Sequence, residues 1–212
     1  PPDNIVKRLK NAGIPTLLVD ASHAELSHII VDNFEGGYNA TNHLIQLGHK
    51  KIAYISDYMQ ESPFDFQPVT DRFRGYQQAL IDADIPLRKA YIKQAELSRE
   101  AAKQMATELL NLPDPPTAIF AYSDIQAFGV LRAANEYGLT VPDDLSIIGY
   151  DDVEAAEYLH LTTVRQELSE SGRLGAQMIL NMIKTPTAVP QKVLLPTKII
   201  ERETTTAFHK NT

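Results

Sequence analysis

Cysteine is absent from this 212-residue sequence, which excludes disulfide bonds, thiolate metal sites and cysteine nucleophiles. Long apolar runs are absent as well: each run is only a few residues long, whereas a helix that spans a bilayer needs roughly 20 residues. We therefore expect no membrane-spanning segment, and the lack of cysteine fits a reducing, cytoplasmic setting.

The usual sequence patterns of catalysis and of cofactor or metal binding are missing too. None of the six histidines lies in an H-x-x-x-H or H-E-x-x-H pattern, and no serine lies in a nucleophile elbow. Gly36-Gly37 matches neither a dinucleotide-binding fingerprint nor a Walker loop. The sequence therefore predicts no metal site, no cofactor, no catalytic residues and no enzymatic activity.

Basic charge is sparse, with 20 Lys and Arg against 27 Asp and Glu and a net charge of −7. Nucleic-acid binding depends on clustered cations that displace counterions from phosphates. The pairs Lys50-Lys51 and Arg88-Lys89 are too short to line a groove of that kind. We therefore do not expect this chain to bind DNA by itself.

The most informative stretch is 116–152. Apolar runs at 118–121 and 147–150 flank a helical pattern that ends at Gly138, which predicts a strand, a helix and a second strand parallel to the first. Ligands of open α/β sheets bind outside the carboxyl ends of the strands. The polar residues at these strand ends, and hence candidate ligand contacts, are Ser123, Asp124 and Asp151.

The rest of the chain continues the alternation of strands and helices, so we expect an α/β fold with parallel sheets. Its length is near the size at which one core divides into two. Further strands are predicted at 17–19, 29–31, 52–55, 91–93, 193–195 and 199–200. Further helices are predicted near 4–12, 33–47, 73–83, 98–110 and 166–184, with a polar, proline-containing loop at 57–71.

Several short motifs, which follow one another in the same order as in the family, resemble the LacI/GalR family of bacterial transcription regulators. They cover nearly the whole chain and are specific as a series. They are Ile30-Val31-Asp32-Asn33, Gly36-Gly37, Leu47-Gly48-His49, Arg72-x-x-Gly75-Tyr76, Val141-Pro142-Asp143-Asp144, Ile148-Gly149-Tyr150-Asp151-Asp152 and Leu161-Thr162-Thr163-Val164-x-Gln166.

The resemblance implies two Rossmann-like βαβ subdomains of periplasmic-binding-protein type I, with three crossovers and an effector between them. Residues 1–31 and 161–190 would form part of the N-terminal subdomain. Residues 32–160 and 191–205 would form a complete C-terminal subdomain, followed by a tail at 206–212. The chain opens at Pro1 without a methionine, and the family's DNA-binding headpiece, hinge helix and first βα units lie outside it.

The implied function is the effector-binding and dimerisation core of a transcriptional regulator. Its partners would be a small polar metabolite of the sugar or nucleoside class, a second copy of the chain, and operator DNA reached only through the missing headpiece. One alternative is a periplasmic sugar-binding protein of an ABC transporter, which shares the fold and the ligand chemistry. Another is a Rossmann-like enzyme.

Two residues are the principal candidates for effector contacts. In the family, the aspartate at the position of Asp151 and the arginine at the position of Arg72 bind the effector, because a carboxylate accepts hydrogen bonds from hydroxyls and a guanidinium donates two in parallel. The alternative roles are structural: Asp151 would form a turn, and Arg72 would pair with Asp71 or Glu61 on the surface.

Three further polar residues are weaker candidates. Ser123 occupies a position where family members often carry an asparagine that contacts the ligand. Asp124 is a candidate contact too, although we expect it to act mainly as the N-cap of its helix. Asp20 matches a cleft position at the end of its own strand.

Leu97 falls where many family members place an aromatic residue that stacks on a sugar. Leucine cannot stack in this way, so its position indicates a departure from the common sugar contact. Phe64 and Phe66, in the predicted loop, are candidate substitutes.

Overall fold

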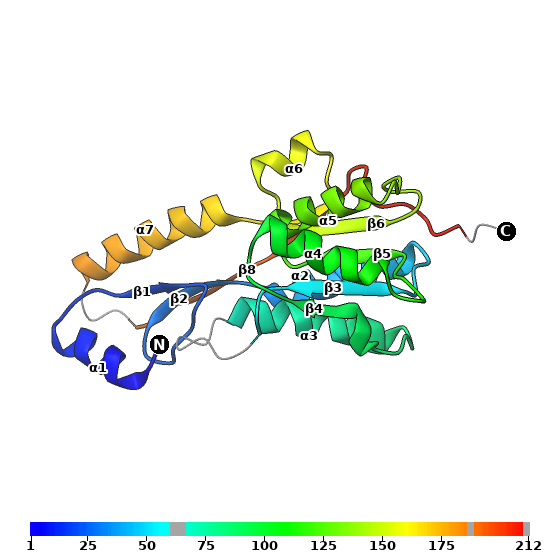
Figure 1. Ribbon diagram of the computed structural model, residues 1–212. Coiled ribbons are helices and arrows are strands. Elements are labelled where there is room, and N and C mark those ends of the chain that lie inside the picture. Colours follow the sequence, from blue (N-terminus) through cyan, green and yellow to red (C-terminus); the bar gives the residue numbers. More distant parts are fainter. Residues whose placement is uncertain (60–66, 186–188, 210–212) are drawn as a thin grey trace.

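The computed structural model describes residues 1–59, 67–185 and 189–209 of the chain. Its strands form two sheets, one of three strands and one of six. The helices α1 (Asp3–Asn11) and α7 (Leu168–Lys184) lie beside the smaller sheet (Figure 1). The strands of that sheet are parallel, in the order β1 (Leu17–Val19), β2 (Ser27–Val31) and β8 (Lys192–Leu195).

The larger sheet is parallel except at β9, which runs antiparallel to its neighbour. In spatial order its strands are β4 (Ile92–Gln94), β3 (Ile52–Ser56), β5 (Ala118–Ala121), β6 (Ser146–Asp151), β7 (Thr163–Gln166) and β9 (Thr197–Ile200). The predicted α/β fold with parallel βαβ units is confirmed.

Helices cover both faces of the larger sheet (Figure 1). On one face lie α2 (Asn33–Gln46) and α3 (Gln67–Asp82), and on the other lie α4 (Arg99–Leu110) and α5 (Asp124–Glu136). The short elements η1 (Lys89–Tyr91) and α6 (Glu154–Tyr158) precede β4 and follow β6. Because neither face meets water, β3 and β5 are buried along their whole length, which explains their continuous apolar runs.

Two glycines allow α2 and α3 to approach closely. A Cβ atom on Gly75 would lie 2.2 Å from the Phe34 carbonyl oxygen, and one on Gly37 would lie 2.2 Å from the Arg72 carbonyl oxygen. Any larger residue would force the helices apart. The close approach positions Arg72, because its backbone makes one of these contacts.

The chain passes between the two sheets at three places that lie side by side. The first runs from β2 into α2, the second from β7 into α7, and the third from β8 into β9. The Asp32 amide donates to the Leu195 carbonyl oxygen (2.9 Å), and Gln166 is paired in register with Thr197. The three crossings therefore form one narrow junction.

The strand pairing corrects the predicted subdomain boundaries at two points. Residues 163–166 were assigned to the N-terminal subdomain, but β7 pairs with β6 in the larger sheet. Residues 192–195 were assigned to the C-terminal subdomain, but β8 pairs with β2 in the smaller sheet. Both segments adjoin a crossing, and motif order along the chain does not indicate which of two sheets a segment joins.

The predicted loop at 57–71 is also too long, because α3 begins at Gln67. Pro68 suggested a loop, yet proline is tolerated in the first turn of a helix, where its missing N–H has no intrahelical partner.

The segment after β9 crosses the amino ends of the central strands. The Ile147 amide donates to the Thr204 carbonyl oxygen (2.7 Å), and the Phe208 amide donates to the Leu47 carbonyl oxygen (2.7 Å). Beneath this segment His49 is buried, with its Nε2 3.0 Å from Ser146 Oγ and 3.1 Å from the Thr206 carbonyl oxygen. His49 thus holds the end of the chain against the sheet.

Candidate effector-binding site

The candidate residues gather at the carboxyl end of the larger sheet, where it faces the smaller one. Asp151 ends β6, and Tyr122 and Ser123 follow β5. Arg72 reaches this edge from α3. The site is therefore built from strand ends that the parallel sheet brings together, as the sequence predicts.

Arg72 is the most constrained of these side chains, with an exposed fraction of only 4%. Its Nε donates to Asn33 Oδ1 (2.8 Å) and its Nη1 donates to the Tyr122 carbonyl oxygen (2.7 Å). Its guanidinium also lies over the Tyr150 ring, 3.6 Å from the centroid. Arg72 is thus a buried cation at the site, while Asp71 pairs with Arg74 at 3.3 Å. Glu61, the other alternative partner, lies outside the described residues.

Asp151 lies beside Arg72 and retains access to solvent, with a side-chain exposed fraction of 23%. Its Oδ1 accepts a hydrogen bond from Gln166 Nε2 (2.5 Å) and lies 3.6 Å from Arg72 Nη1. Burial raises the pKa of the Asp151 carboxyl, while Arg72 and Gln166 oppose that rise. A carboxylate held in this way can accept further hydrogen bonds from a polyol.

Asp151 and Asp152 both adopt positive φ, at 117° and 57°, which non-glycine residues rarely do. Asp152 accepts from Arg165 Nε (2.6 Å) and from Arg202 Nη2 (2.7 Å). It therefore supports the turn, and the turn holds Asp151 at the site.

The N-cap of α5 is Ser123 and not, as was predicted, Asp124. Ser123, with extended φ and ψ, is the N-cap of α5, and its Oγ accepts from the Gln126 amide (3.3 Å). Asp124 is already helical and therefore cannot be the N-cap. The N-cap is the residue just before the backbone becomes helical. Both serine and aspartate are common N-caps, so residue type alone does not decide between Ser123 and Asp124.

Asp124 is instead a fully buried connector. Its Oδ1 accepts from Thr163 Oγ (2.5 Å), and its Oδ2 accepts from the Val153 amide (2.9 Å). Burial raises the pKa of the Asp124 carboxyl to about 7. This side chain joins α5 to β7 and to the start of α6.

Asp20 comes from the other sheet, at the end of β1, with φ at 54°. Burial raises the pKa of Tyr122, Arg72 lowers it, and the negative charges of Asp151, Asp57 and Asp20 raise it. Asp20 is therefore close enough to Tyr122 to interact with it electrostatically.

Leu97 is exposed in the connection between β4 and α4, next to Ser98, whose Oγ accepts from the Ala101 amide (3.1 Å) as the N-cap of α4. No contact joins Leu97 to Arg72 or Asp151 among the interactions described. Phe64 and Phe66 lie outside the described residues.

Four residues that shape the site have no predicted role in it: Asn33, Tyr122, Tyr150 and Gln166. Asn33, Tyr150 and Gln166 belong to the motifs quoted above, and Tyr122 directly precedes the candidate Ser123. These positions in the sequence were the signal that could have identified them. Within the described part of the chain, no group of three or more His, Asp or Glu side chains could hold a metal ion.

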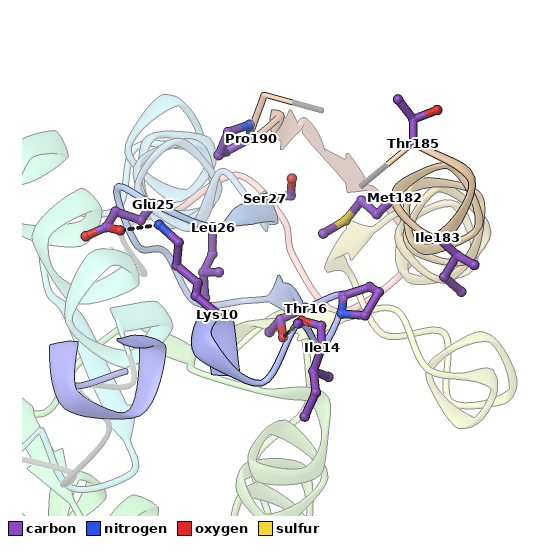
Figure 2. Close-up of a pocket in the computed structure, with 12 residues that line it drawn as sticks. Lys10, Ile14, Thr16, Glu25, Leu26, Ser27, Met182, Ile183, Thr185 and Pro190 are labelled. Atoms are coloured by element: carbon purple, nitrogen blue, oxygen red, sulfur yellow. Dashed lines mark hydrogen bonds and ion pairs between the residues drawn. The ribbon is translucent and has the colours of Figure 1, made fainter. Parts of the chain in front are cut away.

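A separate cavity of about 530 Å³ lies at the far end of the smaller sheet. Figure 2 shows its lining, which includes the Lys10–Glu25 ion pair, Ser27 from β2, and Met182 and Ile183 from α7. None of the candidate effector contacts lines this cavity, so it is distinct from the site described above.

Comparison with known proteins identifies close relatives. The Periplasmic binding protein-like domain family matches residues 41–205. The probable transcriptional repressor ExuR of Bacillus subtilis is 34% identical over 198 residues, covering 92% of this chain and 58% of ExuR. The repressor PurR of Shigella dysenteriae is 35% identical over 194 residues, covering 89% of this chain and 55% of PurR. The chain thus spans little more than half the length of these relatives.

Solved structures agree with the sequence relatives. A LacI family regulator from Enterococcus faecium with bound ribose superposes with a TM-score of 0.87 at 31% identity, covering 99% of this chain and 77% of that one. The regulator CelR in complex with cellobiose gives a TM-score of 0.84 at 29% identity, covering 95% and 62%.

Proposed function

This chain belongs to the LacI/GalR family of transcription regulators, and from that premise we propose that it is the effector-binding core of a repressor that senses a small polar metabolite. The observation that carries the proposal is the Asp151 carboxylate, which remains partly exposed 3.6 Å from the buried Arg72 guanidinium. Operator binding then belongs to the intact protein, through a headpiece outside this chain.

A sugar or a nucleoside is the ligand class that suits this pair best. Hydroxyl groups can donate to Asp151 and accept from Arg72, and Asp20 offers a further acceptor from the opposite sheet. The two structural relatives named above hold ribose and cellobiose.

The ligand would act by favouring one relative orientation of the two sheets. It shifts that equilibrium only by its difference in affinity for the two orientations. In a dimer of the intact protein, the same shift changes the spacing of two headpieces, which must match their half-sites on DNA. Coupling of this kind is typically about 1–3 kcal/mol.

The test is thermal unfolding of the 212-residue chain with D-ribose, cellobiose and adenosine as separate probes. A ligand that binds the folded state raises the free energy of unfolding by about 2.7 kcal/mol when its concentration is 100 times the Kd. We expect at least one probe to raise the Tm of the chain and Asp151→Asn to abolish that rise.

Asp143→Asn is the matched control, because Asp143 is exposed and remote from the site. Loss of the ligand response in both variants would point to a general effect of charge. An unchanged response in Asp151→Asn would refute the site assignment.

The dimer is part of the proposal. The short helix α6, which lies over α5 in Figure 1, exposes Tyr158 (75%) and Leu159 (49%). Solvent-facing apolar residues of this size suit burial against a second copy of the chain. Light scattering should show a dimer for the wild type and a monomer for Tyr158→Ser/Leu159→Ser. Leu87→Ser, at another exposed apolar residue, should leave the mass unchanged.

The relatives named above are transcription regulators, which does not favour the alternative of a periplasmic binding protein of an ABC transporter. For the same reason we propose a role without catalysis, in the cytoplasm where DNA is regulated. In the described part of the chain, no helix has both the length and the apolar character needed to cross a membrane.

A further inference from the structure

We infer that Gln166 is a positioning residue that couples the Asp151 carboxylate to the crossing between β7 and α7. The inference rests on the proposed function, because it requires that a ligand binds Asp151 and that the crossing responds to this binding. It begins from one contact, the 2.5 Å hydrogen bond from Gln166 Nε2 to Asp151 Oδ1.

The backbone of Asp151 does not hold its carboxylate in place by itself. Its φ of 117° is unfavourable for a residue with a Cβ, and such conformations persist only where the surroundings enforce them. Gln166 donates to Oδ1, and Arg72 Nη1 lies 3.6 Å from the same oxygen. The position of this carboxylate therefore depends on Gln166.

Gln166 is also the last residue of the larger sheet before the chain crosses to the smaller one. It ends β7, is paired with Thr197 of β9, and stands two residues before the start of α7. The adjacent Arg165 donates to Asp152 at 2.6 Å. The last two side chains of β7 thus hold the two acidic residues at the end of β6.

The helix beyond the crossing is anchored in the smaller sheet. Leu174 and Met178 of α7 pack with Ile29 and Val31 of β2. A displacement of Gln166 therefore moves the start of a helix whose body packs against the smaller sheet. A ligand hydroxyl that donates to Asp151 Oδ1 shares this oxygen with Gln166, which links ligand binding to the crossing. Because such coupling is reciprocal, the conformation of the crossing also affects the affinity for the ligand.

The first test measures the orientation of the two sheets without any ligand. Since the chain has no cysteine, Ala176→Cys on α7 and Asn135→Cys on α5, both exposed, give a unique pair of spin-label sites. We expect Gln166→Met, which keeps the side-chain length but removes the donor, to shift or broaden the measured distance distribution. Gln104→Met, at an exposed position on α4, should leave it unchanged.

Gln166→Glu distinguishes a hydrogen bond from simple packing. At low pH two adjacent carboxyl groups share a proton, and at high pH they repel each other. The distance distribution of this variant should therefore match the wild type at acidic pH and depart from it at alkaline pH. Distributions that match the wild type in both Gln166 variants at every pH would overturn the inference.

The second test follows the Asp151 carboxyl carbon by NMR, with Asp151→Asn to assign the signal. The Gln166 hydrogen bond lowers the pKa of Asp151, so Gln166→Met should raise proton affinity by about tenfold, the effect of one hydrogen bond of ordinary strength. An unchanged titration would also overturn the inference. Neither test involves a sugar, so failure of the probes to bind would count against the proposed function alone.

Discussion

The guanidinium carbon of Arg72 lies over two aromatic rings, 3.6 Å from the centroid of Tyr150 and 4.4 Å from that of Tyr122. A planar cation stacks on such rings while its edge remains free to donate hydrogen bonds. This arrangement explains how a charged side chain is buried at the site. It also means that a positive charge without the planar guanidinium would not stabilise the site to the same extent.

Arg72→Lys should therefore be destabilising although it conserves charge. Lysine cannot reproduce the bonds to Asn33 Oδ1 and the Tyr122 carbonyl oxygen together with the stacking, so we expect a loss of about 2–3 kcal/mol. Urea unfolding would measure it. Arg74→Lys, at an exposed position on the same helix, should leave the midpoint unchanged, and equal effects in the two variants would contradict the structural account.

The α2–α3 contact gives a second prediction. In Gly75→Ala the new methyl group would meet the Phe34 carbonyl oxygen at 2.2 Å, so the helices must separate, at a cost of about 2–3 kcal/mol. Gly172→Ala on α7 has no neighbour within 4 Å and should be more stable than the wild type by about 0.5–1 kcal/mol. Chemical unfolding of both variants should give opposite signs.

Asp124 makes the stability of the chain depend on pH. Its folded-state pKa of about 7 exceeds the unfolded value of 3.8, so its protonated form contributes stability that is full below about pH 4 and lost as the pH rises through 7. Asp124→Asn mimics the protonated form. Its Oδ1 can accept from the Val153 amide while its Nδ2 donates to Thr163 Oγ.

We therefore expect Asp124→Asn to be more stable than the wild type at pH 8, by roughly 2–4 kcal/mol, and nearly equal to it at pH 4. Guanidinium unfolding across this range would measure the difference. A variant that is less stable than the wild type at pH 8 would contradict a raised folded-state pKa for Asp124.

His49 should act in the opposite direction. Burial lowers its pKa below 6.5, so the folded state resists protonation, and stability falls as the pH drops from about 6.5 through the folded-state pKa. His49→Gln, which keeps polar groups near Ser146 and Thr117, should flatten this dependence. The difference in unfolding free energy between variant and wild type should change most between pH 7 and 5. His43 has its pKa lowered for the same reason and would remain in both proteins.

Buried strands were the part of the fold most accessible to prediction from sequence. The runs at 52–55, 118–121 and 147–150 are apolar throughout because helices cover both faces of their sheet. By contrast, β7 is buried only at its first two residues, and its place beside β6 depends on strand pairing that the residue types of this short segment do not reveal. Its membership in the larger sheet was therefore predicted wrongly.

The site followed the same rule. Asp151 and Arg72, the two principal candidates, lie 3.6 Å apart, and both stand in motifs at predictable strand and helix positions. Whether Ser123 or Asp124 caps α5 depends on a backbone angle, and the contact of Gln166 depends on a side chain that reaches from β7 to the neighbouring β6. Neither is visible in the order of residue types.

Three adjacent crossings, rather than one, set the mechanical character of the molecule. A single connection would let the two sheets twist about it or separate. Three connections side by side permit bending about the line that joins them, but they resist twisting. Cutting the chain at any one of them would leave two still in place. Bending about this line would change the distance between the carboxyl ends of β1 and β6, and with it the space available to a ligand between Asp20 and Asp151.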